Sequence, residues 1–298
     1  MGINASKYNA GHGMQDTGYM RHIFILHPAT CILHLTLVLI FALPSSSRAQ
    51  ERLRLATTTS VQDSGLMPYI LQVFEKRCGC KVDVIAVGSG QALKLAVNGD
   101  VDMVIVHDPA AEKKFLEDGW GINHRTFMMN DFVILGPSSD PAHIKGMKSA
   151  AQAFSSIQKT NSLFISRGDD SGTHKRELDL WQKAGVKPAP PWHMEIGQGM
   201  GAVLTMANEK QAYTICDRAT YRTRVGQFNL KVLVEGDPDL LNYYSAMQVN
   251  PARFPSAKSI LSGQMIGWLC SPEGQKRIGA YAVSGHRLFN PTCDGGKK

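Results

Sequence analysis

From Leu53 onward, short apolar runs alternate with stretches whose apolar residues recur at helical spacing, and this alternation constrains the fold most. Residues 53–56 and 82–87 read as strands, and residues 64–77 between them read as a helix. Apolar residues three and four apart mark one face of a helix, whereas short apolar runs suit buried strands. Because strand–helix–strand order needs a crossover connection, the pattern predicts an α/β fold with a largely parallel sheet.

The alternation continues to the end of the chain, with a looser segment at residues 136–146. Helices are expected at residues 91–98, 109–119, 175–184, 256–270 and 272–282, and strands at residues 103–106, 132–135, 163–165, 213–215, 230–234 and 244–249. Two sets of elements of this size predict two α/β lobes with a cleft between them. Lobe I is predicted to comprise residues 50–133 and 244–298, and lobe II residues 134–243.

The first 49 residues have the composition of a secretory signal peptide. A mostly apolar stretch at residues 32–43 is too short to span a bilayer as a stop-transfer helix. Ser47 and Ala49 supply the small residues that precede a cleavage site. We expect residues 1–49 to be removed, with Met20 as an alternative start of translation, and the remainder to be exported to the periplasm. A retained N-terminal anchor is the alternative.

The charge of the chain excludes one large class of partner. The formal net charge is +7 at pH 7, but the lysines and arginines are dispersed and no basic helix carries interleaved aromatic residues. Nucleic-acid binding is therefore disfavoured. A modest positive surplus fits an anionic ligand or a membrane-facing location equally well. We expect a monomer.

Five cysteines follow the signal peptide, and an odd number leaves at least one thiol free. They are Cys78, Cys80, Cys216, Cys270 and Cys293. Cys270 and Cys293 suit a disulfide that clamps the C-terminal tail. The spacing of Cys78 and Cys80 looks too tight for easy ring closure, and no second pair is spaced to complete a zinc site.

Four turns share one design, in which an apolar strand is followed by small hydroxyl or glycine residues and then by a helix. They are Thr57-Thr58-Thr59-Ser60, Gly88-Ser89-Gly90, the run from Ser166 to His174, and Gly197-Gln198-Gly199-Met200-Gly201. Ligands of open α/β sheets bind at the carboxyl ends of strands, so these turns can face one cleft. Helix N-termini also present unpaired N–H groups and a positive dipole end, which favours an anion.

The run from Ser166 to His174 has the strongest anion-binding composition, because it adds the guanidinium of Arg167 to hydroxyls and glycines. A capped surface turn with Arg167 paired to Asp169 or Asp170 is the structural alternative. If the run binds an anion, both carboxylates should face away from the ligand. A carboxylate that pointed inward would favour phosphate, which carries a proton.

Other chemistries fit less well. Leu93 stands where a dinucleotide fingerprint needs its third glycine, and the P-loop spacing is missing. The four residues that start at Asp170 match an aspartic-protease signature, but the second copy at Asp63 is partial. Ser171 lacks the glycine that precedes a nucleophilic serine by two positions. A secreted hydrolase using Asp170 or Ser171 is a remote alternative, and no catalytic residue is assigned.

Over residues 53–289 the chain resembles the tungstate-binding proteins of ABC-type importers, a family of extracytoplasmic solute-binding proteins. The resemblance rests on Thr57-Thr58-Thr59-Ser60, Gln62-Asp63-Ser64-Gly65, Val87 to Leu93, His107 to Ala111, Asn130 to Val133, Ser166 to His174, Gln198 to Gly201, Tyr213-Thr214 and Asp217-Arg218. The family usually has threonine where Ser89 stands, a departure that keeps the hydroxyl.

The resemblance implies a two-lobed, type II periplasmic-binding-protein fold that closes around an oxyanion and docks on a membrane permease. The residues that it implies for oxyanion contact are Thr58, Thr59, Ser60, Ser89, Arg167, Ser171, Gly172, Thr173 and Thr214. It implies no enzyme activity, no cofactor apart from the transported tungstate or molybdate, and no direct protein–metal ligation. Receptors for molybdate, sulfate or phosphate with the same fold are the alternatives.

The chemistry of the ligand agrees with this set. Tungstate is a dianion without a proton at neutral pH, so a site made of hydroxyls, backbone N–H groups and one arginine suits it. Monohydrogen phosphate carries a proton and needs an acceptor, which such a site lacks. Molybdate and sulfate have the same charge as tungstate, so only the radius of the cavity could separate the three.

Overall fold

The computed structural model describes residues 50–293. The predicted signal peptide and its cleavage site after Ala49 fall on residues 1–49, outside this part. Within residues 50–293 no helix combines the length and apolar character that a membrane crossing requires.

The alternation of strands and helices continues through the described chain. Its strands are β1 (Arg52–Thr58), β2 (Lys81–Val87), β3 (Met103–Val106), β4 (Gly121–Gly136), β5 (Phe164–Ser166), β6 (His193–Glu195), β7 (Thr214–Asp217), β8 (Lys231–Val234), β9 (Leu241–Val249), β10 (Ala282–Val283), β11 (His286–Arg287) and β12 (Asn290–Pro291). Its helices are α2 (Thr59–Asp63), α3 (Leu66–Cys78), α4 (Ser89–Asn98), α5 (Pro109–Glu117), α6 (Ala150–Lys159), α7 (Gly172–Lys183), α8 (Met200–Glu209), α9 (Arg218–Arg222), α10 (Ser259–Leu269) and α11 (Pro272–Ala280), with a 3-10 turn at Pro238–Leu240.

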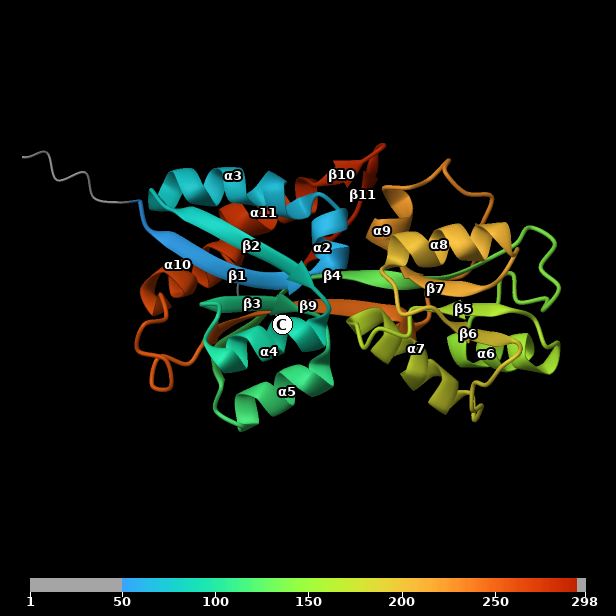
Figure 1. Ribbon diagram of the computed structural model, residues 1–298. Coiled ribbons are helices and arrows are strands. Elements are labelled where there is room, and N and C mark those ends of the chain that lie inside the picture. The colour runs from blue at the N-terminus through green and yellow to red at the C-terminus, as the bar shows by residue number, and fades with distance from the viewer. Residues whose placement is uncertain (1–49, 294–298) are drawn as a thin grey trace, which may run out of the picture. The chain divides into compact units, whose positions relative to one another are not determined.

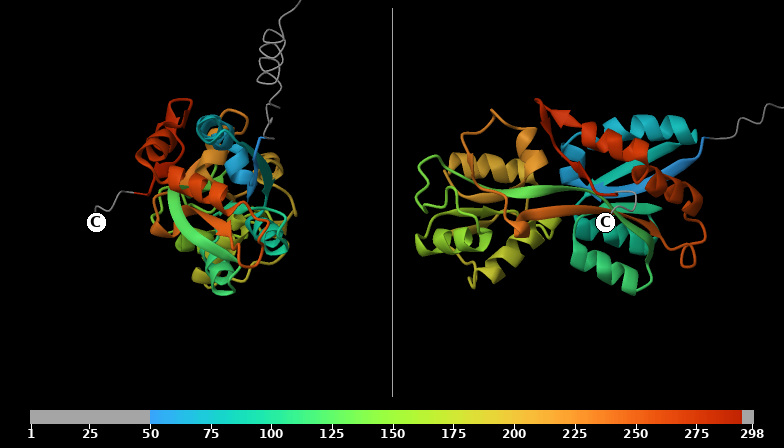
Figure 2. Two further views of the ribbon diagram at one scale, coloured as in Figure 1. Left: turned by 90° about the vertical axis from the view of Figure 1, so that its left-hand side faces the viewer. Right: turned by 180° about the vertical axis from the view of Figure 1, so that it is seen from behind.

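The main sheet is mixed, so the expectation of a largely parallel sheet is wrong. The strand order is β12-β4-β9-β3-β1-β2. β1 pairs in parallel with β2 and β3, whereas β9 runs antiparallel to both β3 and β4. The difference arises because β4 and β9 are long return strands that lie side by side (Figure 2, right).

Layers of helices cover both faces of the first part of this sheet, with α3 and α11 on one side and α4 and α5 on the other (Figure 1). β3 shows why. Its alternate residues point to opposite faces, as strand geometry requires. Met103 and Ile105 join an apolar cluster with α3, α10 and α11, and Val104 and Val106 join one with α4 and α5.

The far end of β4 organises a second group of elements in the same way. Phe132 and Ile134 enter an apolar cluster with α6 and α7, and Val133 and Leu135 enter one with α8. The end of β4 pairs with β7 and β8 instead of β9. The lobe boundaries predicted at residues 133/134 and 243/244 therefore fall inside β4 and β9, and they stay predictions.

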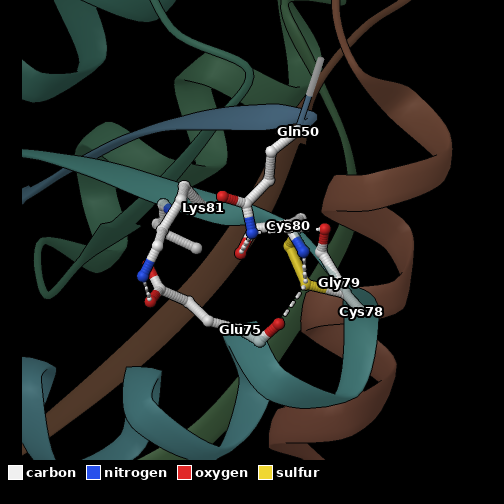
Figure 3. Close-up of a disulfide and its surroundings, with 7 residues drawn as sticks. Gln50, Glu75, Cys78, Gly79, Cys80 and Lys81 are labelled. Atoms are coloured by element: carbon white, nitrogen blue, oxygen red, sulfur yellow. Dashed lines mark hydrogen bonds and ion pairs between the residues drawn. A yellow bond between two sulfur atoms is a disulfide. The ribbon is translucent and has the colours of Figure 1, made fainter. Parts of the chain in front are cut away.

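The cysteines within residues 50–293 form two disulfides. Cys270 pairs with Cys293, as expected of a clamp on the C-terminal tail. Cys216 is free and buried. The expectation that Cys78 and Cys80 are too tightly spaced to pair is wrong, because they form the other disulfide (Figure 3). Gly79 has a φ of 64°, and this left-handed turn brings the two Cα atoms to 5.2 Å.

Candidate functional site

The first two turns lie side by side because the strands before them are parallel and in register. Thr58 at the end of β1 is opposite Val87 at the end of β2. Helix α2 therefore begins beside helix α4. Thr58 caps α2 by accepting a hydrogen bond from the Val61 N–H at 3.4 Å, so its own hydroxyl hydrogen stays available. Thr58 and Ser60 are buried, and Thr59 is half-buried.

Ser89, at the start of α4, has a side-chain hydroxyl that forms no hydrogen bond within the fold. It is 0 % exposed, and its Oγ has no hydrogen-bond partner in the described chain. The cap residue of α4 is Gly88, which provides no side-chain bond to the first N–H groups of the helix. A buried hydroxyl without a partner costs free energy, so a ligand that accepts its hydrogen would be stabilised there.

The third turn leads from β5 into α7. Ser171 caps α7 by accepting a hydrogen bond from the His174 N–H at 3.3 Å. Gly168 and Asp170 both have positive φ, at 60° and 57°, which turns the chain sharply before the helix. Thr173, in the first turn of α7, is buried, and its Oγ1 finds no partner within residues 50–293. Thr173 is therefore, like Ser89, a buried hydroxyl near the start of a helix without a hydrogen-bond partner in the described chain.

Arg167 is 3 % exposed and is the buried cation of the third turn. Its Nε and Nη2 donate to Asp169 Oδ2 at 3.1 and 2.5 Å, whereas Nη1 makes no hydrogen bond to the described residues. Arg167 therefore pairs with Asp169, as the structural alternative expects, but as a buried residue. That Asp169 faces away from the ligand stays a prediction. Asp170 differs from Asp169, because its side chain is 64 % exposed and pairs with Lys175.

The Asp169 carboxylate is held ionised. Burial raises its pKa, but hydrogen bonds from Arg167 and Ser171 and the positive charge of Arg167 outweigh burial and lower it. Oδ1 also accepts the Ser171 N–H at 3.2 Å. Asp169 therefore neutralises part of the Arg167 charge and leaves one edge of the guanidinium unpaired. Its acceptor capacity is largely taken up inside the turn.

The second and third turns touch one another. A Cβ built on Gly88 would lie 3.6 Å from the Cα of Ser171, and one on Gly90 would lie 3.2 Å from Asp170 Oδ2. A Cβ on Gly172 would lie 2.5 Å from Cε1 of His107, the residue that follows β3. Only glycine fits at that last position. The structure therefore brings Ser89 and the Arg167 run to one place, as the four-turn pattern predicts.

His107 is a neutral side chain beneath this contact. Burial lowers its pKa to about 4, and the nearby charges of Arg167 and Arg176 act in the same direction. Its Nδ1 lies 2.9 Å from Asn242 Oδ1, so the ring donates to that amide oxygen. Because the ring is neutral, it adds no positive charge beside that of Arg167.

The fourth turn joins the same group through its backbone. The Gln198 N–H donates to the Arg167 carbonyl at 3.3 Å, and the Ile196 N–H donates to the Ser166 carbonyl at 3.2 Å. Gly199 caps α8 without a side-chain bond. Arg224 lies against Gly201, with its nitrogens 3.2–3.3 Å from a Cβ built there. No motif had pointed to Arg224.

Thr214 differs from the other predicted ligand residues. Its Oγ1 donates to the Ile165 carbonyl at 2.8 Å, so its only hydroxyl hydrogen already serves the fold. Beyond the predicted ligand residues, four more buried groups are unpaired within the described part, namely Ser166 Oγ, His174 Nε2, Thr220 Oγ1 and Thr292 Oγ1. Ser166 and His174 bound the third turn. Thr220 lies on α9, which contacts α2, and had no local signature.

The arrangement does not suit hydrolysis. Ser171 Oγ accepts a backbone N–H, and His174 Nδ1 accepts the Asp170 N–H at 3.1 Å, so His174 is not placed to remove the Ser171 proton. The exposed Asp170 pairs with Lys175 and shares no proton with a second carboxylate. What the turns do offer is hydrogen-bond donors around a buried guanidinium, which favours a compact anion.

A hollow of about 760 Å³ lies elsewhere, between α5 and the strands β4 and β9. Its lining includes Glu112 and Glu117, which pair with His124 and Lys113 of the same lining. An oxyanion of a few ångströms needs far less space than this hollow provides. We therefore place the candidate site at the four turns and not in this hollow.

Comparisons with known proteins identify the family of the chain. Residues 44–273 match the family model of the PBP superfamily domain. The tungstate-binding protein TupA of Peptoclostridium acidaminophilum is 41% identical over 251 residues, which cover 83% of this chain and 88% of that protein. The chain belongs to the TupA family of the PBP superfamily.

Two further relatives support membership of the TupA family. A putative ABC transporter anion-binding protein of Haloferax volcanii is 44% identical over 254 residues, covering 84% of this chain and 74% of that protein. The crystal structure described as the tungstate ABC transporter from Geobacter sulfurreducens is 52% identical, with a TM-score of 0.72, and the match covers 78% of this chain and 99% of that one. TupA-family proteins are binding proteins, not enzymes.

Proposed function

We propose that this protein is the binding component of an ABC-type importer and that it binds tungstate among the four turns. The observation that carries the proposal is one contact: the turn with the unpaired Ser89 hydroxyl lies against the turn with Arg167 and the unpaired Thr173 hydroxyl. Donors from both turns could then surround one anion. Family membership supports tungstate as that anion.

The proposed donors are those with a free hydrogen or free charge. They are the hydroxyls of Thr58, Thr59, Ser60, Ser89, Ser171 and Thr173, Nη1 of Arg167, and the backbone N–H groups at the starts of α4 and α7, including Gly172. Thr214 is left out as a side-chain donor because its hydrogen is used by Ile165. Ser166, His174 and Thr220 are added as candidates.

The ionised Asp169 makes phosphate the second candidate. A carboxylate beside the site is the acceptor that monohydrogen phosphate needs. Against phosphate stands the geometry of Asp169, which already accepts from Arg167 and from the Ser171 N–H. We therefore expect phosphate to bind more weakly than tungstate or molybdate, which carry no proton.

The proposal also covers the location of the protein and the way in which it delivers its ligand. Export through the signal peptide would place residues 50–298 in the periplasm as a monomer that delivers tungstate to a membrane permease. The two lobes, residues 50–133 with 244–298 and residues 134–243, would close on the anion. Of the four apolar clusters in the described chain, two draw their residues mainly from the first lobe and two mainly from the second, which supports this division.

Thermal unfolding of residues 50–298 against a panel of oxyanions tests the assignment. At a hundred times Kd a ligand adds about 2.7 kcal/mol, which corresponds to a rise in Tm of about 5 to 11 °C for a chain of this size. We expect that shift with tungstate and with molybdate. A shift with phosphate and none with tungstate would contradict the proposal.

A matched pair of arginine variants serves as the control. Arg167→Ala should abolish most of the tungstate shift. Arg52 is an exposed arginine at the start of β1 and pairs with Asp83. Arg52→Ala therefore removes the same charge as Arg167→Ala. It should keep the full shift, which would separate specific contact from a change in net charge.

A further inference from the structure

The Cys78–Cys80 disulfide lies at the end of α3, where the chain turns into β2 (Figure 3). The anion site makes no use of it. The turn tip at Gly79 faces open space, since a Cβ built there would meet no atom within 4 Å. A reagent can therefore approach this disulfide from the tip of the turn.

The two sulfur-bearing residues differ in exposure. Cys80 is 2 % exposed and belongs to the core cluster under β1 and α3, whereas Cys78 is half-buried. Cys78 also lines a hollow of about 450 Å³ together with Phe74 and Trp268. A half-buried cysteine beside a buried one suits thiol–disulfide exchange, because the outer sulfur can be attacked and the inner one is the leaving group.

The surroundings of the turn also favour a thiolate. Lys76 and Arg77 precede Cys78, and Lys81 follows Cys80. Arg77 pairs with Glu273 and Lys81 pairs with Glu75, so Lys76 is the cation of this group that attracts an anionic thiolate nucleophile. The Cys80 N–H donates to Cys78 Sγ at 3.2 Å, and a backbone donor stabilises this sulfur when it is released with negative charge. The C-terminal end of the α3 dipole acts in the opposite direction, but falls off within one turn.

The other disulfide has a structural position. Cys270 and Cys293 are 23 residues apart in sequence, against 2 for Cys78 and Cys80. This bridge fixes the C-terminal tail to the end of α10, and a hydrogen bond from the Cys293 N–H to Gln275 Oε1 at 2.9 Å holds it to α11. Closing a longer loop constrains the unfolded chain more, so its loss is more costly. The two bridges should therefore differ in their resistance to reduction.

We propose that Cys78–Cys80 is a thiol–disulfide exchange site that takes two electrons from a dithiol. A thiolate of the dithiol attacks Cys78 Sγ, the Cys78–Cys80 bond breaks, and Cys80 leaves as a thiolate that takes up a proton. The second thiol of the dithiol then attacks the dithiol sulfur that is bound to Cys78. This step closes the new disulfide within the dithiol and releases Cys78, which takes up the proton. The dithiol becomes a disulfide, and the protein gains two thiols.

This exchange should not affect the anion site. Cys80 precedes the first residue of β2 and Gly88 follows the last, so the 7 residues of the strand separate the two sites. At about 3.3 Å per residue that is about 23 Å. Oxyanion binding thus provides an independent check that the protein is folded in both redox states. A failure of the exchange proposal would leave the proposed function untouched.

Equilibration of residues 50–298 with mixtures of reduced and oxidised dithiothreitol tests the proposal. Thiols are trapped with an alkylating reagent, and mass spectrometry reports each pair. We expect Cys78 and Cys80 to be alkylated at a reductant ratio at least about tenfold lower than Cys270 and Cys293. Opening of both pairs at one ratio, or earlier opening of Cys270–Cys293, would overturn the proposal.

Two single variants test the roles of the two sulfurs. In Cys80→Ser the remaining Cys78 thiol should react with an aromatic disulfide reagent and keep the mixed disulfide. In Cys78→Ser the buried Cys80 should react at least about tenfold more slowly. Equal rates in two variants that both retain the oxyanion-induced rise in Tm would overturn the assignment of Cys78 as the attacked sulfur. If a variant does not fold, the equilibrium experiment on the unmodified protein decides alone.

Discussion

The two groups of turns that form the anion site contribute different chemistry. The turns at Thr58 and Ser89 carry no charge and offer hydroxyls and the N–H groups of two helix starts. The run around Arg167 adds a buried guanidinium together with its own carboxylate, Asp169. The second group therefore attracts an anion by its positive charge. The first group selects among anions by their size and by the number of hydrogen bonds that they accept.

The largest expected effect comes from removing the charge. Arg167→Ala should lower the tungstate affinity by about a hundredfold, since a charge-assisted hydrogen bond contributes up to about 3 kcal/mol. Arg167→Lys keeps the charge but loses the planar fork, and should lie between the variant and the parent. Calorimetric titration measures both. Affinity within twofold of the parent in Arg167→Ala would show that the run is structural.

Acid should weaken the contact between the two groups through His107. Its pKa of about 4 in the folded chain lies below the ordinary histidine pKa of 6.5, so between these two pH values the unfolded chain binds the extra proton. Stability is therefore lost as the pH falls through this window, by up to about 3 kcal/mol.

Denaturant unfolding at pH 7 and at pH 5 measures this loss. His107→Gln removes the titrating group and should lose less stability between the two pH values than the parent does. An equal loss in the variant and the parent would assign the effect to other groups.

A methyl group added to Gly172 should push its turn away from the His107 ring. Gly172→Ala places a Cβ 2.5 Å from the His107 ring, and overpacking of this kind costs about 1 to 3 kcal/mol. Tungstate affinity should fall by about five- to a hundredfold if the contact is needed for binding. The double variant with His107→Ala restores the space and should recover part of the affinity. No recovery would mean that the loss arises elsewhere.

Single hydroxyls should have the smallest effects, and they separate ligand donors from structural ones. Ser89→Ala and Thr173→Val should each reduce affinity by about two- to twelvefold while the unliganded Tm stays equal or rises, because an unpaired buried hydroxyl is removed. Thr214→Val should do the reverse, lowering the Tm through the lost bond to Ile165 and changing affinity little. The opposite pattern would exchange the two roles.

Much of this site could be predicted from the sequence because its signals are local. A strand end followed by Thr, Ser or Gly and a helix appears in consecutive residues, and Ser89 and Arg167 were found in this way. Parallel pairing of β1 and β2 then brings the first two turns together without further information. Thr220 could not be found, because only the packing of α9 against α2 gives it relevance.

Two side-chain pairings depend on backbone detail. Positive φ at Gly168 and Asp170 turns Asp169 back onto Arg167, and a left-handed Gly79 brings Cys78 to Cys80, which the sequence analysis did not expect. Neither conformation follows from composition. The length of β4 was missed for a different reason, since residues 122–126 in its first half are all exposed or half-buried and form no apolar run.

Calorimetric titration of residues 50–298 with tungstate, in two buffers of different ionisation enthalpy at neutral pH, tests the central claim most directly. A site made of donors should bind the dianion without taking up or releasing a proton. The account predicts the same heat of binding in both buffers and a much lower affinity for phosphate. Buffer-dependent heat, or phosphate bound more tightly than tungstate, would contradict it.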